Sequence, residues 1–380
     1  MNQPIKEKTH LPNGELPGKS RILLAPLDWG LGHATRCIPI IKELLAQDCE
    51  VWLAGEGAQE ELLKTEFPEL PFLQLPGYKI KYAKTKKGLF WKMVQQSPKL
   101  SLAIRFENKW LKKVVDKYNF DAIISDNRYG LFHSTIPSIF ITHQLRIKSP
   151  FGKWTEKIVQ SRNYKYINRF TECWIPDWGD ENNLAGELSH PELKPAIPIF
   201  YIGILSRFEN DTTIAEKKNN LLVLLSGPEP QRSMLEEKII KEISHYNGTA
   251  TIVRGLPLSP SHIPYTDMIK VFNHLPAAAL NMAMQEAEYV ICRSGYSSVM
   301  DVARLHKKSI MIPTPGQTEQ EYLADILMKK GFAVCYNQND FSLENALKTA
   351  KVFNYTFPEL RADDLLKNRI KDFLTSLKKG

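Results

Sequence analysis

Short apolar runs recur along the chain, separated by longer stretches in which apolar positions follow a helical period. In the first half, these patterns predict strands at 22–26, 50–54, 121–125 and 138–142 and helices at 34–47 and 100–117. Strands that alternate with helices are typical of a parallel sheet covered on both faces. The first half therefore predicts an α/β domain.

The same pattern starts again in the second half of the chain. It predicts strands at 221–226, 249–254, 269–272, 289–292 and 309–312 and helices at 233–244, 277–286, 297–305 and 319–330. The polar stretch 202–220 has no clear period and separates the two series. A chain of 380 residues is long enough for two domains, each with its own core. We expect a flexible tail at 1–20, a first domain at 21–203, a linker at 204–220, a second domain at 221–355 and a helical segment at 356–380.

The composition argues against membrane-spanning and disulfide-rich classes. No apolar run approaches the roughly 18 residues that a membrane-spanning helix needs. Residues 1–20 are polar and lack the apolar core of a signal peptide, so we expect a soluble, cytoplasmic protein. The five cysteines are scattered and have no neighbouring ligands at metal spacing, so we expect reduced thiols and no metal site.

Positive charge is concentrated in one segment. The net charge is +8, and residues 77–118 contain twelve basic and two acidic residues, interleaved with aromatic side chains. Such a segment suits an anionic membrane surface, a nucleic acid or an anionic substrate, and a solvated lysine-rich face is the alternative. No nucleic-acid-binding motif accompanies it, so we expect no nucleic-acid partner.

A glycine-rich turn, DWGLGHATR, joins the first predicted strand to the first predicted helix. Gly30 and Gly32 allow close approach of a ligand, and a helix N-terminus attracts anions. A dinucleotide-binding GxGxxG motif is one interpretation, but Thr35 stands where its third glycine would be. Glu56 could serve there as the ribose-binding acid, so a dehydrogenase stays open. The remaining alternative is a plain turn with a buried, hydrogen-bonded His33.

The second half has three polar loops at predicted strand ends: SGPEPQR at 226–232, RSGYSSVMD at 293–301 and PTPGQTEQE at 313–321. Open α/β sheets bind ligands at the carboxyl ends of their strands. Gly295 suits phosphate oxygens at a strand-to-helix turn. We expect Asp301 in the first helical turn, where it accepts hydrogen bonds from a ribose diol or forms a capping box with Ser298.

Together, the stretches DWGLGHATR, SGPEPQR, CRSGYSSVMD and PTPGQTEQEYLA resemble the nucleotide-sugar glycosyltransferases of the GT-B fold, particularly the MurG-like group with its family 28 C-terminal domain. The similarity covers residues 21 to about 351. It implies two Rossmann-like α/β domains that face a central cleft, with a UDP sugar held by the second domain. Asp301 stands in place of the family's ribose-binding glutamate, residues 272–275 fall where the base is contacted, and Gln320 and Glu321 correspond to paired glutamines that contact the donor sugar. The donor-binding candidates are Gly32, Ser226, Gly227, Arg232, His274, Leu275, Arg293, Ser294, Gly295, Tyr296, Ser297, Asp301, Gln317, Gln320 and Glu321.

Glycosyl transfer needs a base for the acceptor hydroxyl and positive charge for the departing nucleoside diphosphate. His33, with an ordinary pKa near 6.5, is the candidate base. Backbone N–H groups at the Gly32, Gly227 and Gly295 turns could stabilise the leaving group. No DxD-type motif is present, so we expect no metal and no cofactor, and the resemblance implies inversion. The acceptor-side candidates at other strand ends are Asp28, Arg36, Asp126, Arg128, His143 and Gln144.

The sequence therefore predicts a cytoplasmic hexosyltransferase that uses a UDP-sugar donor. Its acceptor is unknown; one alternative is a lipid-linked acceptor, reached at the inner face of a membrane through residues 77–118. A nucleotide-sugar epimerase of the same architecture stays open, although no set of catalytic carboxylates is evident for it. A non-catalytic protein that binds sugar nucleotides or a lipid surface is the alternative from another class.

Overall fold

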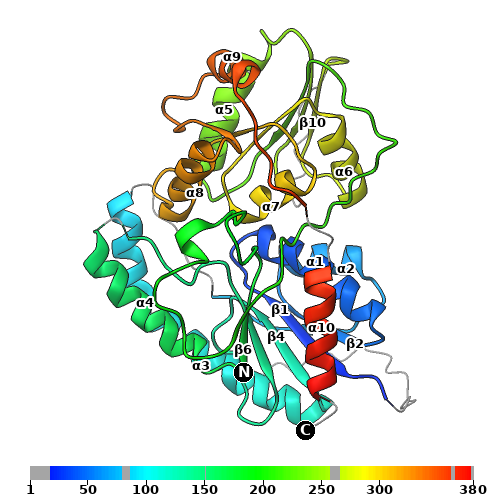
Figure 1. The fold of residues 1–380 in the computed structure, drawn as a ribbon, viewed down its shortest axis with the longest axis vertical. Coiled ribbons are helices and arrows are strands. Elements are labelled where there is room, and N and C mark those ends of the chain that lie inside the picture. Colours follow the sequence, from blue (N-terminus) through cyan, green and yellow to red (C-terminus); the bar gives the residue numbers. More distant parts are fainter. Residues whose placement is uncertain (1–17, 79–85, 150, 257–265, 361–363, 378–380) are drawn as a thin grey trace, which may run out of the picture.

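Two α/β units make up the molecule, each built on a parallel sheet (Figure 1). The computed structural model describes residues 18–78, 86–149, 151–256, 266–360 and 364–377, and the side chains of all of these except 86–98. Most of the expected tail, and residues 79–85 of the basic segment predicted at 77–118, lie outside the described residues.

In the first unit, the sheet order is β3-β2-β1-β4-β5-β6-β7. Its strands are β1 (Arg21–Pro26), β2 (Glu50–Gly55), β3 (Phe72–Gln74), β4 (Ala122–Asp126), β5 (Ser138–Ile141), β6 (Glu172–Ile175) and β7 (Ile199–Tyr201). Its helices are α1 (Leu31–Ala46), α2 (Ala58–Glu66), α3 (Lys86–Tyr118) and α4 (Lys153–Ile167). The strand order reverses between β1 and β4, and such a switch point leaves a crevice beyond the strand ends.

The second sheet follows the same plan, with the order β10-β9-β8-β11-β12-β13. Its strands are β8 (Asn220–Leu224), β9 (Thr249–Val253), β10 (Ile269–Phe272), β11 (Tyr289–Cys292), β12 (Ser309–Met311) and β13 (Val334–Cys335). Its helices are α5 (Gln231–Ile243), α6 (Ala277–Glu286), α7 (Tyr296–Arg304), α8 (Thr318–Lys329) and α9 (Leu343–Val352). Here the switch point lies between β8 and β11, which places the loops after these two strands side by side.

One continuous apolar core runs through both units. Ile22 and Leu24 on β1, Ile38 on α1 and Val299 on α7 are fully buried and belong to the same cluster. In Figure 1, α7 of the upper unit lies over α1 of the lower one. The two units are therefore packed against each other through α1 and α7, the helices that follow β1 and β11.

The last helix, α10 (Asp364–Leu377), returns to the first unit. It lies beside α1 in Figure 1. Phe373 packs edge-on against Trp174 with ring centroids 5.8 Å apart, and Arg369 pairs with Glu172 at 3.1 Å. The chain thus crosses between the units twice.

Several elements were not predicted from the sequence: α2, β3, α4, β6, β7, β13 and α9. Helix α3 also begins at Lys86 rather than at residue 100 and runs through Pro98, which reads as a helix breaker in isolation. Helix α4 has no clean apolar stripe because Trp154 and Ile158 face solvent. Short strands and helices with exposed apolar positions leave little periodic signal.

Candidate active site

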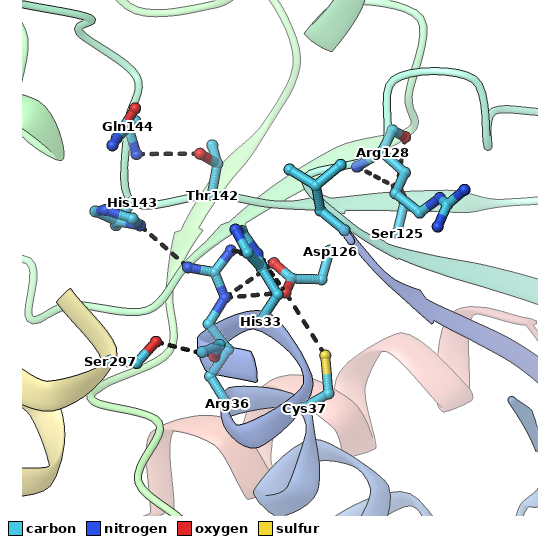
Figure 2. A network of polar contacts seen from close by, with 12 residues as sticks. His33, Arg36, Cys37, Ser125, Asp126, Arg128, Thr142, His143, Gln144 and Ser297 are labelled. Atoms are coloured by element: carbon cyan, nitrogen blue, oxygen red, sulfur yellow. Dashed lines mark hydrogen bonds and ion pairs between the residues drawn. The ribbon is translucent and has the colours of Figure 1, made fainter. Parts of the chain in front are cut away.

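The DWGLGHATR turn lies at the switch point of the first sheet. Pro26, at the end of β1, is in register with Asp126 at the end of β4. Gly30 precedes α1 with φ 84°, a left-handed conformation that glycine adopts most readily. The turn therefore starts α1 beside the end of β4, and His33 and Arg36 come to lie next to Asp126 (Figure 2).

Asp126 and Arg36 form a buried ion pair. Their exposures are 0% and 2%, and Arg36 Nε lies 2.9 and 3.0 Å from the two carboxylate oxygens. Burial raises the pKa of Asp126, but the charges of Arg36 and His33 outweigh it and lower that pKa to about 2. Asp126 is therefore ionised at neutral pH, and both side chains are too enclosed to form the open acceptor surface expected of them.

His33 joins this pair through one ring nitrogen. Its Nδ1 lies 3.0 Å from Asp126 Oδ2 and 3.0 Å from Arg36 Nη2, while Nε2 has no hydrogen-bond partner among the described residues. Burial and the neighbouring Arg36 lower the pKa of His33, against the opposing effect of Asp126. The ring is therefore neutral at pH 7, and about 15% of the side chain is exposed.

His143 connects the network to the second unit. Its Nδ1 lies 3.1 Å from Arg36 Nη1, and its Nε2 lies 2.7 Å from Glu319 Oε1 at the start of α8. Its ring stacks on Tyr296 of α7, with centroids 4.3 Å apart and planes 11° apart. Glu319 was not among the predicted site residues, because a glutamate in the first turn of a helix is usually a dipole-stabilising surface residue.

Gly32 makes room for the second unit in this structure. Its carbonyl accepts a hydrogen bond from Ser297 Oγ at 2.9 Å, and a Cβ at position 32 would lie 2.9 Å from the same oxygen. A side chain there would therefore crowd Ser297 and disturb this hydrogen bond. The predicted donor-binding residues Gly32 and Ser297 contact each other across the junction.

In the second unit, polar atoms without partners surround the turn at Gly227. Arg293 is 1% exposed and donates to the carbonyls of Ile312 and Gln231, while its Nε is buried without a partner among the described residues, as is Thr314 Oγ1. A Cβ at Gly227, where φ is +101°, would lie 3.3 Å from Thr314 Oγ1 and 3.9 Å from Arg293 Nε. Burial lowers the pKa of Arg293 to about 10. An unpaired buried cation beside a glycine turn is suited to an anionic ligand.

The prediction that Asp301 lies in the first turn of its helix is wrong. Helix α7 begins at Tyr296 with Gly295 as N-cap, so Asp301 lies in the second turn and forms no capping box with Ser298. Its carboxylate accepts a hydrogen bond from Ser206 Oγ at 2.6 Å. Burial raises its pKa to about 6, opposed by the nearby Arg207.

Arg207 is a residue that sequence reasoning missed, because the linker containing it has no periodic pattern. Its Nε is buried without a partner in the described part of the chain, and burial lowers its pKa. It lies beside Asp301 and also acts on His274, whose pKa burial and Arg207 both lower. The linker thus supplies a cation to the same side of the second sheet as the predicted ribose contact.

The loop at 313–321 is held by its own side chains. Gln320 accepts a hydrogen bond from the backbone N–H of Thr314 at 2.8 Å and donates to Gln317 at 2.5 Å. Glu321 accepts one from the backbone N–H of Gly316 at 3.1 Å. These donor-sugar candidates shape the loop, whereas Glu319, which was not among them, reaches across to His143 of the first unit.

Other candidates have structural partners. Arg128 is fully buried, donates to Glu107 at 2.6 Å and to the carbonyls of Pro26 and Pro76, and so is a packing residue rather than an acceptor ligand. Arg232 pairs with Glu229 at 2.6 Å and with Glu236 at 2.9 Å on its own helix. Both arginines are thus held by carboxylates of their own unit.

The remaining predicted residues lie around the crevices. Asp28 accepts a hydrogen bond from the backbone N–H of Tyr78 at 2.9 Å, and Glu56, the acid of the dehydrogenase interpretation, accepts one from that of Gly77 at 2.8 Å. The backbone N–H of Gln144 donates a hydrogen bond to Thr142 Oγ1 at 3.0 Å. Ser294 Oγ donates to the carbonyl of Gln320 at 2.8 Å, Leu275 packs against the core, His274 is exposed, and Ser226 lies directly before the Gly227 turn.

The described residues contain no group of three or more potential metal ligands among His, Cys, Asp and Glu. None of the described helices has both the length and the apolar character needed to cross a bilayer.

Comparison with known proteins agrees with this arrangement. Residues 258–374 match the glycosyltransferase family 28 C-terminal domain. An uncharacterized glycosyltransferase of Methanosarcina acetivorans is 24% identical over 345 residues, covering 82% of each chain. The UDP-N-acetylglucosamine--N-acetylmuramyl-(pentapeptide) pyrophosphoryl-undecaprenol N-acetylglucosamine transferase of Haemophilus ducreyi is 23% identical over 329 residues, covering 83% of this chain and 85% of that protein.

Solved structures share the fold. The glycotransferase of kitacinnamycin superposes with a TM-score of 0.62 at 12% identity, covering 95% of this chain and all of that one. MurG of Acinetobacter baumannii gives 0.52 at 14% identity, covering 94% and 100%. Two Rossmann-like units with a family 28 domain define the chain as a GT-B glycosyltransferase, an enzyme that transfers sugars. Within that class, it is a MurG-like glycosyltransferase, and the predicted fold and enzyme class are confirmed.

Proposed function

We propose that the enzyme transfers a sugar from a UDP-sugar donor to an acceptor hydroxyl, with inversion and without a metal, and that His33 is the general base. The observation that carries this proposal is the geometry of His33. Asp126 is ionised and lies at hydrogen-bond distance from Nδ1, while Nε2 has no partner among the described residues. Arg36 Nη2 also lies 3.0 Å from Nδ1, but it donates a hydrogen bond to Asp126 Oδ1. The ionised carboxylate therefore determines the tautomer: it favours the proton on Nδ1, which leaves the lone pair on Nε2.

The reaction then follows from the two ring nitrogens. The acceptor oxygen attacks the anomeric carbon and its proton moves to His33 Nε2, while the bond from that carbon to the nucleoside diphosphate breaks. The resulting imidazolium is stabilised by the Asp126 carboxylate. A single displacement from the face opposite the leaving group inverts the anomeric carbon.

The leaving group would be held in the second unit. The unpartnered atoms of Arg293 and Thr314 and the open Gly227 turn suit a diphosphate, and the N-terminus of α5 adds a favourable dipole. These groups would neutralise the developing negative charge without a metal ion. Neighbours solved with thymidine diphosphates, and the UDP-linked name of the Haemophilus ducreyi relative, support a nucleoside diphosphate sugar as donor.

The test measures nucleoside diphosphate release upon addition of acceptor, with UDP-N-acetylglucosamine, UDP-glucose and a thymidine diphosphate sugar as donors. We expect UDP release that depends on acceptor and persists in EDTA, with the product anomer opposite to the donor's. Release without acceptor dependence, or conversion of the donor to its epimer, would contradict sugar transfer. Loss of activity in EDTA that Mg²⁺ or Mn²⁺ restores would contradict the metal-independent step alone.

We also propose that the acceptor is lipid-linked and that α4 contacts an anionic membrane surface. Phe151, Trp154 and Ile158 are 44%, 74% and 44% exposed. A shallow groove on this helix combines apolar and basic side chains, from Trp154, Lys157, Ile158, Ser161, Arg162 and Lys165. Aromatic residues beside basic ones suit the interface of an anionic bilayer. The Haemophilus ducreyi relative, by its name, acts on a pyrophosphoryl-undecaprenol substrate, which supports a lipid acceptor.

Vesicle sedimentation tests this surface. Trp154→Glu should weaken binding to vesicles that contain phosphatidylglycerol, whereas Val352→Glu, a matched change at an 84% exposed apolar residue of the second unit, should not. Equal binding of both variants would contradict a role for α4. Wild-type binding to neutral vesicles as strong as to anionic ones would contradict the charge contribution.

A further inference from the structure

Glu319 is the carboxylate through which the second unit contacts the buried His33–Asp126–Arg36 cluster. Its Oε1 lies 2.7 Å from His143 Nε2, and the side chains of His143 and Glu319 are 8% and 30% exposed. The charged and titratable groups around the cluster come from α1, β4, the loop after β5, α7 and α8: His33, Arg36, Cys37, Asp126, His143, Tyr296 and Glu319.

The hydrogen bonds of His143 determine which of its nitrogens has the proton. Arg36 can only donate, so His143 Nδ1 must accept from Arg36 Nη1 at 3.1 Å. The ring proton then lies on Nε2 and is donated to Glu319. Without Glu319, the ring is free to place its proton on Nδ1, where it would face the N–H of Arg36.

Arg36 in turn determines how Asp126 and His33 meet. With Nη1 on His143, the opposite edge of the guanidinium presents Nε and Nη2 to Asp126. This arrangement keeps Asp126 Oδ2 within 3.0 Å of His33 Nδ1. The charge of Glu319 also reaches His33, because the two groups interact favourably when the ring is protonated.

We propose that Glu319 is a positioning residue, which through His143 and Arg36 orients His33 for proton transfer and stabilises its imidazolium form, so that the second unit completes the base of the first. This inference rests on the proposed role of His33. The His143–Tyr296 stack and the Ser297–Gly32 hydrogen bond hold the same junction, so the chain of contacts exists only while α7 and α8 lie against the first unit.

The experiment compares Glu319→Gln, Glu319→Ala and a matched control, Thr318→Val. Thr318, the neighbouring residue of α8, donates a hydrogen bond to the carbonyl of Lys148 in the first unit at 3.0 Å, whereas the side-chain hydrogen bonds of His143 go to Arg36 and Glu319. The wild type and these three variants are titrated by NMR of ¹⁵N-labelled histidine, with the His33 signal assigned from its loss in His33→Gln. Turnover is measured over the same pH range.

We expect Glu319→Ala to lower the pKa of His33 and to reduce kcat by about 10²-fold, the usual effect of a misplaced reacting group. Glu319→Gln keeps an acceptor for His143 and should restore part of kcat, while the pKa of His33 stays low because the charge is absent. Thr318→Val should leave both unchanged.

A His33 titration in Glu319→Ala that matches the control would overturn the inference. So would weaker donor binding with unchanged kcat, because Glu319 would then contact the donor sugar. The NMR titration does not depend on turnover. A wild-type protein that releases no nucleoside diphosphate would therefore contradict the proposed function and leave the coupling of Glu319 to His33 separately measurable.

Discussion

Asp126→Asn removes the charge that both Arg36 and His33 require. The pKa of this carboxyl is about 2 instead of its ordinary 3.8, which corresponds to about 2.5 kcal/mol of stability at neutral pH. The substitution also leaves the Arg36 guanidinium, 2% exposed, without its anion, and breaking a buried ion pair in this way costs about 3–5 kcal/mol. The two figures describe the same pair, so we expect a loss of about 3–5 kcal/mol in the free energy of unfolding.

Urea unfolding at pH 7 measures this loss, and a pH series identifies its origin. Because the pKa of Asp126 is lowered in the folded protein, its contribution is complete above pH 4 and disappears as the pH falls through 2. The difference between wild type and Asp126→Asn should therefore shrink between pH 4 and pH 2. The control is the double variant Arg36→Met, Asp126→Leu, which removes both charges and should recover much of the lost stability. A loss below about 1 kcal/mol, or a double variant no more stable than the single one, would refute the assignment of a buried ion pair.

Three other predictions concern the site. His33→Gln should lower kcat by about 10² to 10⁴-fold and leave UDP affinity within a few fold, and near-normal turnover would move the base to Asp28, Asp126 or His143. In wild type, kcat/KM should fall as the pH drops through the pKa of His33, which lies below 6.5 because of burial and Arg36; an acidic limb above 6.5 would contradict this assignment. Asp301→Asn should weaken UDP binding measured by calorimetry, at about 1.5–3 kcal/mol per charge-assisted hydrogen bond. Since burial raises the pKa of Asp301 to about 6, the same variant should gain stability at pH 7, by up to about 3 kcal/mol; unchanged UDP affinity would exclude the ribose contact.

The apolar pattern of the sequence predicted most strands of the two sheets and the loops at their ends. Apolar runs predicted β1, β2, β4, β5, β8 and β9–β12, because strands buried on both faces need continuous apolar side chains. Glycine-containing motifs at strand ends predicted ligand sites at the carboxyl ends of the strands, since these ends share one edge of a parallel sheet. His33, Asp126 and His143 were therefore found as candidates, although their mutual contacts were not.

Only the tertiary structure decided which polar residues are partners. The adjacency of β1 and β4, which lie about 100 residues apart in the chain, brings Asp126 to His33 and Arg36. The packing of α8 against the first unit brings Glu319 to His143. The residue type alone does not distinguish a buried carboxylate from a solvated one, because burial depends on strand order and on how the two units pack. For the same reason, Arg128 was predicted as a site residue but is buried beside Glu107. Conversely, Arg207 and Glu319 were not predicted, yet Arg207 lies beside Asp301 and Glu319 lies beside the His33 cluster.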